Sequence, residues 1–240
     1  MAKIRLQKIL ASAGIDSRRK CEQLILDGFV RVNRKLIDTL PAFADPAEDL
    51  ITVHGKRIPS PERVYFLLNK PKGVICTNSD PQRRKKAIDF IDCKERIFCV
   101  GRLDADTTGA IILTNDSQLA NRLTHPRYEL SKTYQVTVKG RVIGPQIDKL
   151  KKGMWLSEGK TNPAAVKVVK RTNSITVLDV SIRQGLNRQI RRVMAKLDHP
   201  VKSLHRIKIG NISVKGLKMG AYKKLTKGHI DYLKKETKGK

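Results

Sequence analysis

The stretch GRLDADTTG, residues 101–109, separates two short apolar runs at 97–100 and 110–113. Short apolar runs bounded by glycine are typical of buried strands, so the sequence predicts two core strands joined by this loop. The loop carries Asp104 and Asp106 in a chain that has 50 Lys and Arg but only 22 Asp and Glu. Because acids are scarce, two of them in one central loop require an explanation, either as a turn that satisfies its own backbone or as chemistry.

More strands are expected on both sides of this loop, where residues alternate between apolar and polar or run apolar. They cover residues 64–68, 134–138, 164–169, 175–182, 201–209 and 212–214. Such patterns are typical of antiparallel strands with one covered face. Asp116 or Ser117 is a suitable cap for a helix that runs toward Pro126, and a second helix is expected over 188–197. The fold class that follows is α+β, with a mostly antiparallel central sheet.

The N-terminal residues have the pattern of a separate small module. Leu6, Ile9 and Leu10 share a helical face, and a second apolar helical face ends at Gly28. Two short helices are therefore predicted between residues 3 and 28. Tight hairpins are expected after them, over 30–38 and 51–58.

The chain divides at a stiff polar break, Pro-Ser-Pro-Glu at residues 59–62. We expect a small module at 1–60, a larger domain at 63–228 and a basic tail at 229–240 that is either a short helix or a disordered arm. Residues 78–86, NSDPQRRKK, contain no apolar residue and are predicted to form a mobile basic loop.

The charge of the chain favours a polyanionic partner. The formal net charge is +28, and Lys and Arg that neutralise phosphates release condensed counterions, so nucleic acid is the expected partner. No run reaches the roughly 18 apolar residues that a membrane-spanning helix needs, and the N-terminus lacks the apolar core of a signal peptide. We therefore expect a cytoplasmic protein without a membrane partner.

The cysteine and histidine residues give no sign of a metal site. The chain has four Cys residues, at 21, 76, 93 and 99, without a Cys-x-x-Cys pair, and five scattered His residues. Structural zinc sites need ligands paired at short spacing. Dinucleotide and phosphate-loop motifs are also missing from the sequence. Neither a metal nor a cofactor is expected.

The N-terminal module resembles a known RNA-binding domain. The stretch LQKILASAGIDSRRKCEQLILDGFVRVN, residues 6–33, is similar to the alpha-L module first recognised in a small-subunit ribosomal protein. The resemblance implies that its helix pair presents basic side chains to RNA phosphates. Arg18, Arg19 and Lys20 stand at the start of the second helix, where free backbone N–H groups also favour anions.

Five further motifs, in the right order, resemble the RsuA/RluB family of pseudouridine synthases. The loop at 101–109 is similar to the family's GRLDxxTxG signature. Before it lies KPKG at 70–73, and after it come KTY at 132–134, NRQIRR at 187–192 and an LxRxxIG pattern at 204–210. The likeness extends over nearly the whole chain to about residue 228 and implies a pseudouridine-synthase-like catalytic domain.

This resemblance assigns roles to individual residues. It implies that Asp104 is the catalytic carboxylate, that Tyr134 lies against the target base and that Arg191 is the cation that pairs with Asp104. Desolvation would otherwise tend to neutralise the acid, and a guanidinium can keep it ionised. Asp106 is the second choice for catalysis. The expected reaction isomerises uridine to pseudouridine in ribosomal RNA and uses no cofactor.

The remaining site residues are expected to contact RNA. They are Arg18, Arg19, Lys20, Lys70, Arg102, Lys132, Arg188, Arg192 and Leu204. Leu204 would line the base pocket, and the cations would contact phosphates. The resemblance slightly favours large-subunit over small-subunit RNA, implies no protein partner and is consistent with a monomer.

Several alternatives remain open at the level of sequence. A catalytically inert RNA-binding or ribosome-assembly protein would need only the charge, the N-terminal module and the basic tail. A metal-dependent nuclease would need more acids near Asp104 and Asp106 than the sequence provides. Arg188, Arg191 and Arg192 could also form a simple phosphate-binding stripe. Side-chain identity does not decide whether Asp104 attacks C1′, adds to C6 or assists elimination through a glycal.

Overall fold

The computed structural model describes residues 3–238, which form two compact units. The first comprises the chain up to Val64 together with the short segments 93–96 and 115–117. The second, larger unit holds the rest of the chain. No helix within residues 3–238 is long and apolar enough to span a membrane.

The N-terminal unit contains the two predicted helices, α1 (Leu6–Ser12) and α2 (Arg18–Leu26). Ser17 caps α2 by accepting a hydrogen bond from the backbone N–H of Lys20 at 3.3 Å. A four-stranded sheet follows in the order β3 (Lys35–Ile37), β2 (Val30–Val32), β5 (Ile51–Val53), β6 (Lys56–Arg57), and β1 (Ile4–Arg5) pairs with β4 (Phe43–Ala44). The apolar helix faces close over this sheet, which confirms the predicted helix pair and hairpins.

A nine-stranded sheet forms the centre of the larger unit. Its main order is β13 (Ala165–Arg171), β14 (Ile175–Ile182), β10 (Lys132–Lys139), β15 (Val201–Ile209), β9 (Thr108–Thr114), β7 (Tyr65–Lys70) and β17 (Tyr222–Lys224). The short strands β8 (Phe98–Cys99) and β16 (Ile212–Ser213) pair with β9 and β15. Only the β15–β9 pair is parallel among these described strands, so the predicted mostly antiparallel sheet is confirmed.

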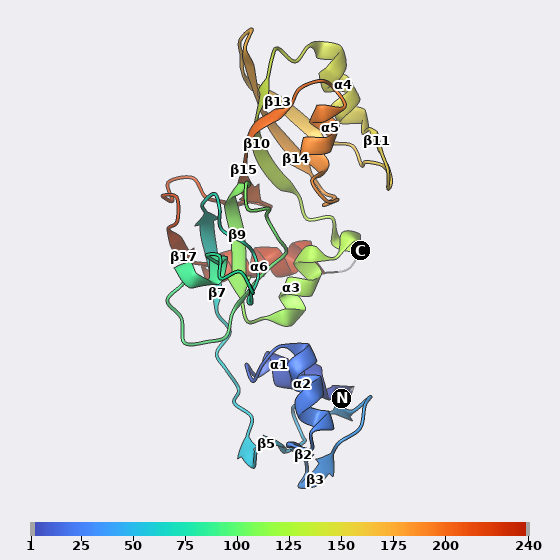
Figure 1. The fold of residues 1–240 in the computed structure, drawn as a ribbon, viewed down its shortest axis with the longest axis vertical. Coiled ribbons are helices and arrows are strands. Elements are labelled where there is room, and N and C mark those ends of the chain that lie inside the picture. Colours follow the sequence, from blue (N-terminus) through green and yellow to red (C-terminus); the bar gives the residue numbers. More distant parts are fainter. Residues whose placement is uncertain (1–2, 239–240) are drawn as a thin grey trace. The chain divides into compact units, whose positions relative to one another are not determined.

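Two apolar cores lie along this sheet, one for each half. Helices α4 (Gly144–Lys152) and α5 (Gln189–Ala195) pack on β10 and β14, and they lie on one side of these strands in Figure 1. Helices α3 (Ser117–Thr124) and α6 (Lys227–Glu236) pack on β7 and β9. The parallel pair β15–β9 joins the two halves. The loop at 101–107 enters β9 at this junction.

The C-terminal segment differs from its predicted boundary. Helix α6 begins at Lys227, so a tail starting at residue 229 would divide it. Leu233 is fully buried in the core with β7 and β9, because α6 is amphipathic and covers apolar surface there. Residues 227–236 therefore belong to the larger unit, while residues 239 and 240 of the predicted tail lie outside the described residues.

Some elements were not predicted. They are α4, β1, β4, β17, the 3-10 helices Ala87–Phe90 and Pro126–Tyr128, and the small hairpin of β11 (Trp155–Leu156) and β12 (Gly159–Lys160). The hairpin precedes β13 in the chain. Its residues Trp155 and Glu158 form hydrogen bonds with side chains at the C-terminal part of α5 and just after it.

Gly109 fixes the end of the central loop. It lies opposite Arg206 in the parallel β15–β9 bridge with φ of +105°, a backbone conformation that side chains rarely adopt. A Cβ atom at this position would lie 2.3 Å from the carbonyl oxygen of Arg206. Glycine therefore allows the chain to pass from the loop into β9 while its backbone lies in close contact with β15.

Candidate active site

The predicted loop lines a pocket of about 1040 Å³ in the larger unit. Residues 100–105 form one wall, while β10 and β15 contribute Lys132, Tyr134 and Leu204, and the segment before α5 contributes Arg188. The volume is sufficient for a nucleotide. Asp104, Tyr134 and Leu204, which come from distant parts of the sequence, therefore meet in one cavity.

Three backbone N–H groups fix the conformation of the loop. Thr107 donates to the carbonyl of Asp104 at 3.1 Å, and Gly73 of the KPKG turn donates to the carbonyl of Ala105 at 2.7 Å. The N–H of Leu103 lies 3.4 Å from Sγ of Cys76. These contacts leave the Asp104 carboxylate on the pocket wall, with its side chain 39% exposed.

The partner of Asp104 is Arg188, which corrects the expected pairing with Arg191. Nη1 of Arg188 lies 3.3 Å from Oδ2 of Asp104 and 3.6 Å from Oδ1 of Asp106. Arg191 instead places Nη2 3.0 Å from Oδ2 of Asp106 and 3.3 Å from the backbone oxygen of Asp106. No ion pair joins Arg191 to Asp104 in the described part of the chain.

The difference arises where α5 begins. Arg188 was expected to be the first residue of a helix, but it adopts a left-handed conformation (φ 47°, ψ 30°) and α5 starts at Gln189. This turn brings the Arg188 guanidinium to the acidic loop. Arg191, one turn further on, contacts Asp106 and the hydroxyl of Thr107 and so holds the end of the loop.

Tyr134 shares the pocket with two basic residues. Arg206 is only 3% exposed and donates to the carbonyl of Ala110 at 2.6 Å and to the Tyr134 hydroxyl at 3.4 Å. Lys132 donates to the carbonyl of Leu130 at 3.2 Å. Burial, and then the charge of Arg206, lower the pKa of Lys132 to about 8. Both cations line the same pocket as Asp104.

Arg206 is a site residue that sequence reasoning missed. It occupies the third position of the LxRxxIG pattern, where it was noted as part of a motif and given no role. One of its atoms, Nη2, is buried without a hydrogen-bond partner in the described structure. The signal that could have identified it is its position two residues after Leu204, on the same face of the predicted strand, because charged groups are rarely buried on an apolar face without a purpose.

Lys70 does not have the expected RNA-binding position. Its side chain is 0% exposed, and its ammonium group donates to the carbonyls of Val74 at 2.7 Å and Pro71 at 3.1 Å. Burial lowers the pKa of Lys70. The side chain points under the KPKG turn and stabilises it, so the prediction of direct RNA contact is wrong.

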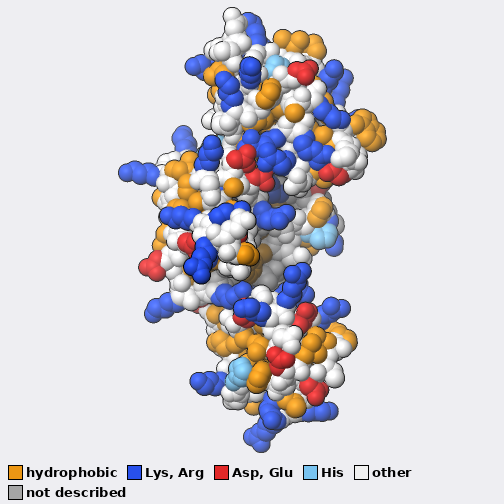
Figure 2. Space-filling model, viewed as in Figure 1, with side chains coloured by type: hydrophobic (Ala, Val, Ile, Leu, Met, Phe, Trp, Pro, Cys, Tyr) orange, Lys and Arg blue, Asp and Glu red, His pale blue; other side chains and the backbone are white. Residues whose placement is uncertain are grey.

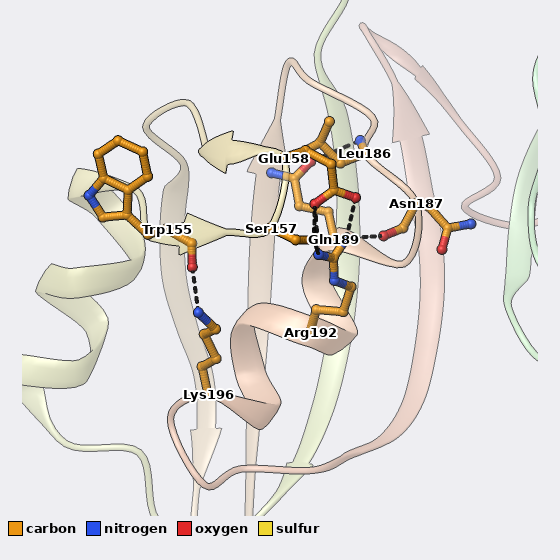
Figure 3. Close-up of polar contacts among 8 residues, drawn as sticks. All are labelled: Trp155, Ser157, Glu158, Leu186, Asn187, Gln189, Arg192 and Lys196. Carbon is orange, nitrogen blue, oxygen red and sulfur yellow. Dashed lines mark hydrogen bonds and ion pairs between the residues drawn. The ribbon is translucent and has the colours of Figure 1, made fainter.

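Arg192 also differs from the expectation. Its Nη1 and Nη2 atoms each lie 2.7 Å from a carboxylate oxygen of Glu158, and Nη2 lies 2.6 Å from Oγ of Ser157 (Figure 3). This bidentate pair lowers the pKa of Glu158. In the described structure Arg192 is not part of the pocket wall, because its position on α5 directs it toward the β11–β12 hairpin.

The other predicted cations are accessible. Arg102 is exposed at the pocket, and Arg18, Arg19 and Lys20 are exposed at the start of α2 in the N-terminal unit. Lys20 forms a surface ion pair of 3.3 Å with Asp16. Lys and Arg side chains are spread over the visible face of each unit in Figure 2.

The site has the groups that a nucleoside-modifying enzyme needs. An acid held by a guanidinium, a tyrosine and an apolar leucine face one cavity, and basic residues surround it. Among residues 3–238, no group of three or more His, Cys, Asp or Glu residues is arranged to hold a metal ion. The fold and the site together define an RNA-modifying enzyme with an additional small basic domain.

The chain belongs to the RNA pseudouridylate synthase family. The model of that family matches residues 64–196, and the model of the S4 domain matches residues 4–40. The family and the N-terminal domain expected from the sequence motifs are thereby confirmed.

Individual relatives agree with this membership. The chain is 40% identical over 233 residues to ribosomal large subunit pseudouridine synthase B of Bacillus subtilis (strain 168), covering 96% of this chain and 95% of the relative. It is 37% identical over 235 residues to an RNA pseudouridine synthase of Aquifex aeolicus (strain VF5), with 97% and 94% covered. A crystal structure of a pseudouridylate synthase matches with a TM-score of 0.70 and 30% identity over 96% of this chain and 99% of the other.

Proposed function

We propose that the protein isomerises a single uridine of ribosomal RNA to pseudouridine and that Asp104 is its catalytic carboxylate. The observation that carries the proposal is the Asp104 side chain on the wall of a nucleotide-sized pocket, 3.3 Å from Arg188. The Bacillus subtilis relative, by its name, acts on the large ribosomal subunit. We extend this to the present chain and propose large-subunit RNA as its substrate.

The chemistry needs an ionised acid but no second substrate. The N1–C1′ bond of uridine breaks, the base turns, and C5 bonds to C1′. The C5 proton is then lost and N1 is protonated, so the atoms balance. Arg188 pairs with the Asp104 carboxylate at 3.3 Å and orients it toward the sugar. Attack at C1′, addition at C6 and elimination through a glycal all require a carboxylate at this position.

The target base must leave its helical stack to reach Asp104. Unstacking costs a few kcal/mol, which contacts in the pocket must offset. Tyr134 supplies a replacement surface for the flipped base, and Leu204 packs beside it. Arg191 contributes to catalysis by holding the loop through Asp106.

RNA outside the pocket is bound by charge. Arg102, Lys132 and Arg188 contact phosphates near the target nucleotide, and Arg18, Arg19 and Lys20 contact phosphates from the N-terminal domain at 1–60. The catalytic domain begins at residue 63 and includes α6. The protein works in the cytoplasm as a monomer. Because phosphate neutralisation releases counterions, its affinity for RNA falls steeply as salt rises.

Mapping of pseudouridine in ribosomal RNA tests the proposal. RNA from cells that lack the protein is compared with RNA from cells that carry the wild type or Asp104→Asn. One modified position should disappear and return only with the wild type. An unchanged modification map would contradict the proposed substrate. Restoration by Asp104→Asn would contradict the proposed role of the acid.

A further inference from the structure

The β11–β12 hairpin carries an exposed aromatic side chain that the proposed chemistry does not use. Trp155 is the only tryptophan of the sequence, and it is 68% exposed. Figure 3 shows its ring extending away from Arg192 and Glu158. Most tryptophan side chains bury the greater part of their surface, so an exposed one indicates a binding surface.

The hairpin itself is firmly anchored. Lys196, directly after α5, donates to the backbone oxygen of Trp155 at 2.8 Å, and Arg192 of α5 holds Glu158 and Ser157 in the turn (Figure 3). At its base, Met154 and Thr161 exchange backbone and side-chain hydrogen bonds of 2.9 and 3.0 Å. The indole is thus presented on an ordered support although the ring contributes little buried area.

A second feature of the hairpin is its positive charge. Lys160 lies opposite Trp155 in the β11–β12 pair, Lys151 and Lys152 end α4 directly before the hairpin, and Lys196 contacts it from just after α5. Glu158 is the only acid between residues 149 and 160, and Arg192 already pairs with it. An aromatic ring beside lysines is a combination that binds unpaired nucleotides, because the ring stacks on bases and the lysines attract phosphates.

The hairpin is also continuous with the pocket rim. Asn162 follows β12 by two residues, lines the pocket, and donates its backbone N–H to Gln184, another pocket residue, at 3.0 Å. Arg192 donates to the backbone oxygen of Asn187 at 3.3 Å, which is also on the pocket wall. An RNA strand leaving the pocket on this side would pass onto the hairpin.

We propose that Trp155, with Lys160 and Lys196, forms a second RNA subsite on which an unpaired base outside the uridine pocket stacks. The inference rests on the proposed function, since it takes the substrate RNA as its ligand. It adds a requirement for at least one unpaired nucleotide beyond the target. Its effect is on affinity, because the indole touches neither the reacting base nor Asp104.

Fluorescence of the single tryptophan tests this directly. We expect the emission of Trp155 in the full-length protein to be quenched in a saturable way by a substrate RNA fragment that contains the target uridine and unpaired flanking nucleotides. Binding is measured in parallel by the anisotropy of the end-labelled fragment. Saturated binding with unchanged tryptophan emission would overturn the proposal.

Substitutions give the second readout. Trp155→Ala should weaken binding and raise KM by about fivefold or more, with kcat unchanged, because stacking on an aromatic side chain stabilises each bound base. Trp155→Phe should restore most of the affinity, because it keeps a ring. Val169→Ala is the matched control, since Val169 on β13 is also an exposed apolar residue (49%) of the larger unit, outside the hairpin. Equal affinity of Trp155→Ala and wild type would overturn the subsite.

The two proposals fail in different ways. If the wild type forms no pseudouridine in any ribosomal RNA fragment, the proposed function fails. If the wild type forms product, but Trp155→Ala binds and reacts like the wild type, only the second subsite fails. Circular dichroism and the Tm of each variant show that it is folded, as expected for an exposed side chain.

Discussion

Arg188 and Asp104 are 84 positions apart in the chain, yet Nη1 of the one lies 3.3 Å from Oδ2 of the other. A second ion pair, Arg191 to Asp106 at 3.0 Å, lies beside it. Together they join the loop at 101–107 to the start of α5. Asp104 on the pocket wall therefore pairs with Arg188, and Asp106 pairs with Arg191 and, at 3.6 Å, with Arg188 as well.

Replacing Arg188 by Ala should mainly lower the rate of the chemical step. Asp104 would lose the cation that orients it and stabilises its charge, so we expect kcat to fall roughly 10- to 100-fold, as for removal of other charge-stabilising groups in active sites. The measurement is single-turnover pseudouridine formation at saturating RNA.

Arg192→Ala is the matched control for that substitution. It removes an arginine from the same helix, but one that pairs with Glu158 outside the pocket. Because this pair lies at the surface, we expect kcat to stay unchanged and the Tm to change little. Equal losses of kcat in the two variants would contradict the assigned partner of Asp104.

RNA affinity should depend on pH through Lys132. Burial and the charge of Arg206 lower its pKa to about 8, so the side chain is mostly protonated at neutral pH and mostly neutral one unit above its pKa. Loss of this cation should weaken RNA binding as pH rises through about 8. Titration of the dissociation constant across this range measures the effect.

The variant Lys132→Arg separates this group from others that titrate. A guanidinium stays charged throughout the range, so the fall in affinity above pH 8 should become smaller. An identical pH profile in wild type and Lys132→Arg would show that Lys132 is not the titrating group.

Lys70→Ala should affect stability and leave intrinsic RNA affinity unchanged. The substitution leaves the carbonyls of Pro71 and Val74 without their buried donor and opens a cavity. We expect a loss of roughly 2–4 kcal/mol in the free energy of unfolding. Denaturant titration gives this value, and the dissociation constant of the folded fraction gives the affinity. A weaker dissociation constant with unchanged stability would instead support direct RNA contact by Lys70.

Regular periodicity made most of the fold predictable. The strands at 134–138 and 175–182 have a strong alternation, and they appear as β10 and β14 with only small changes at their ends. Helix α4 was not predicted, although it begins with Gly144-Pro145 and proline is favourable in the first turn of a helix. The two-residue strands β11 and β12 are too short to give any periodicity.

The sequence predicted the chemistry of the site better than it predicted which side chains form ion pairs there. The scarcity of acids drew attention to Asp104, and the resemblance of its loop to the family signature indicated that it is a site residue. The choice of its partner depended on one backbone conformation at Arg188, which ordinary helix patterns do not reveal. Lys70 was assigned to RNA from its charge, and only the packing of the KPKG turn showed that its ammonium group points inward.

The most direct measurement is made on Asp104→Asn with a ribosomal RNA fragment that the wild type modifies. The substitution keeps the size of the side chain and removes its charge. We expect pseudouridine formation to be abolished in single-turnover assays, while the dissociation constant for RNA is unchanged or improved because a negative charge has left a phosphate-binding cleft. Product formation at the wild-type rate by Asp104→Asn would contradict the central claim.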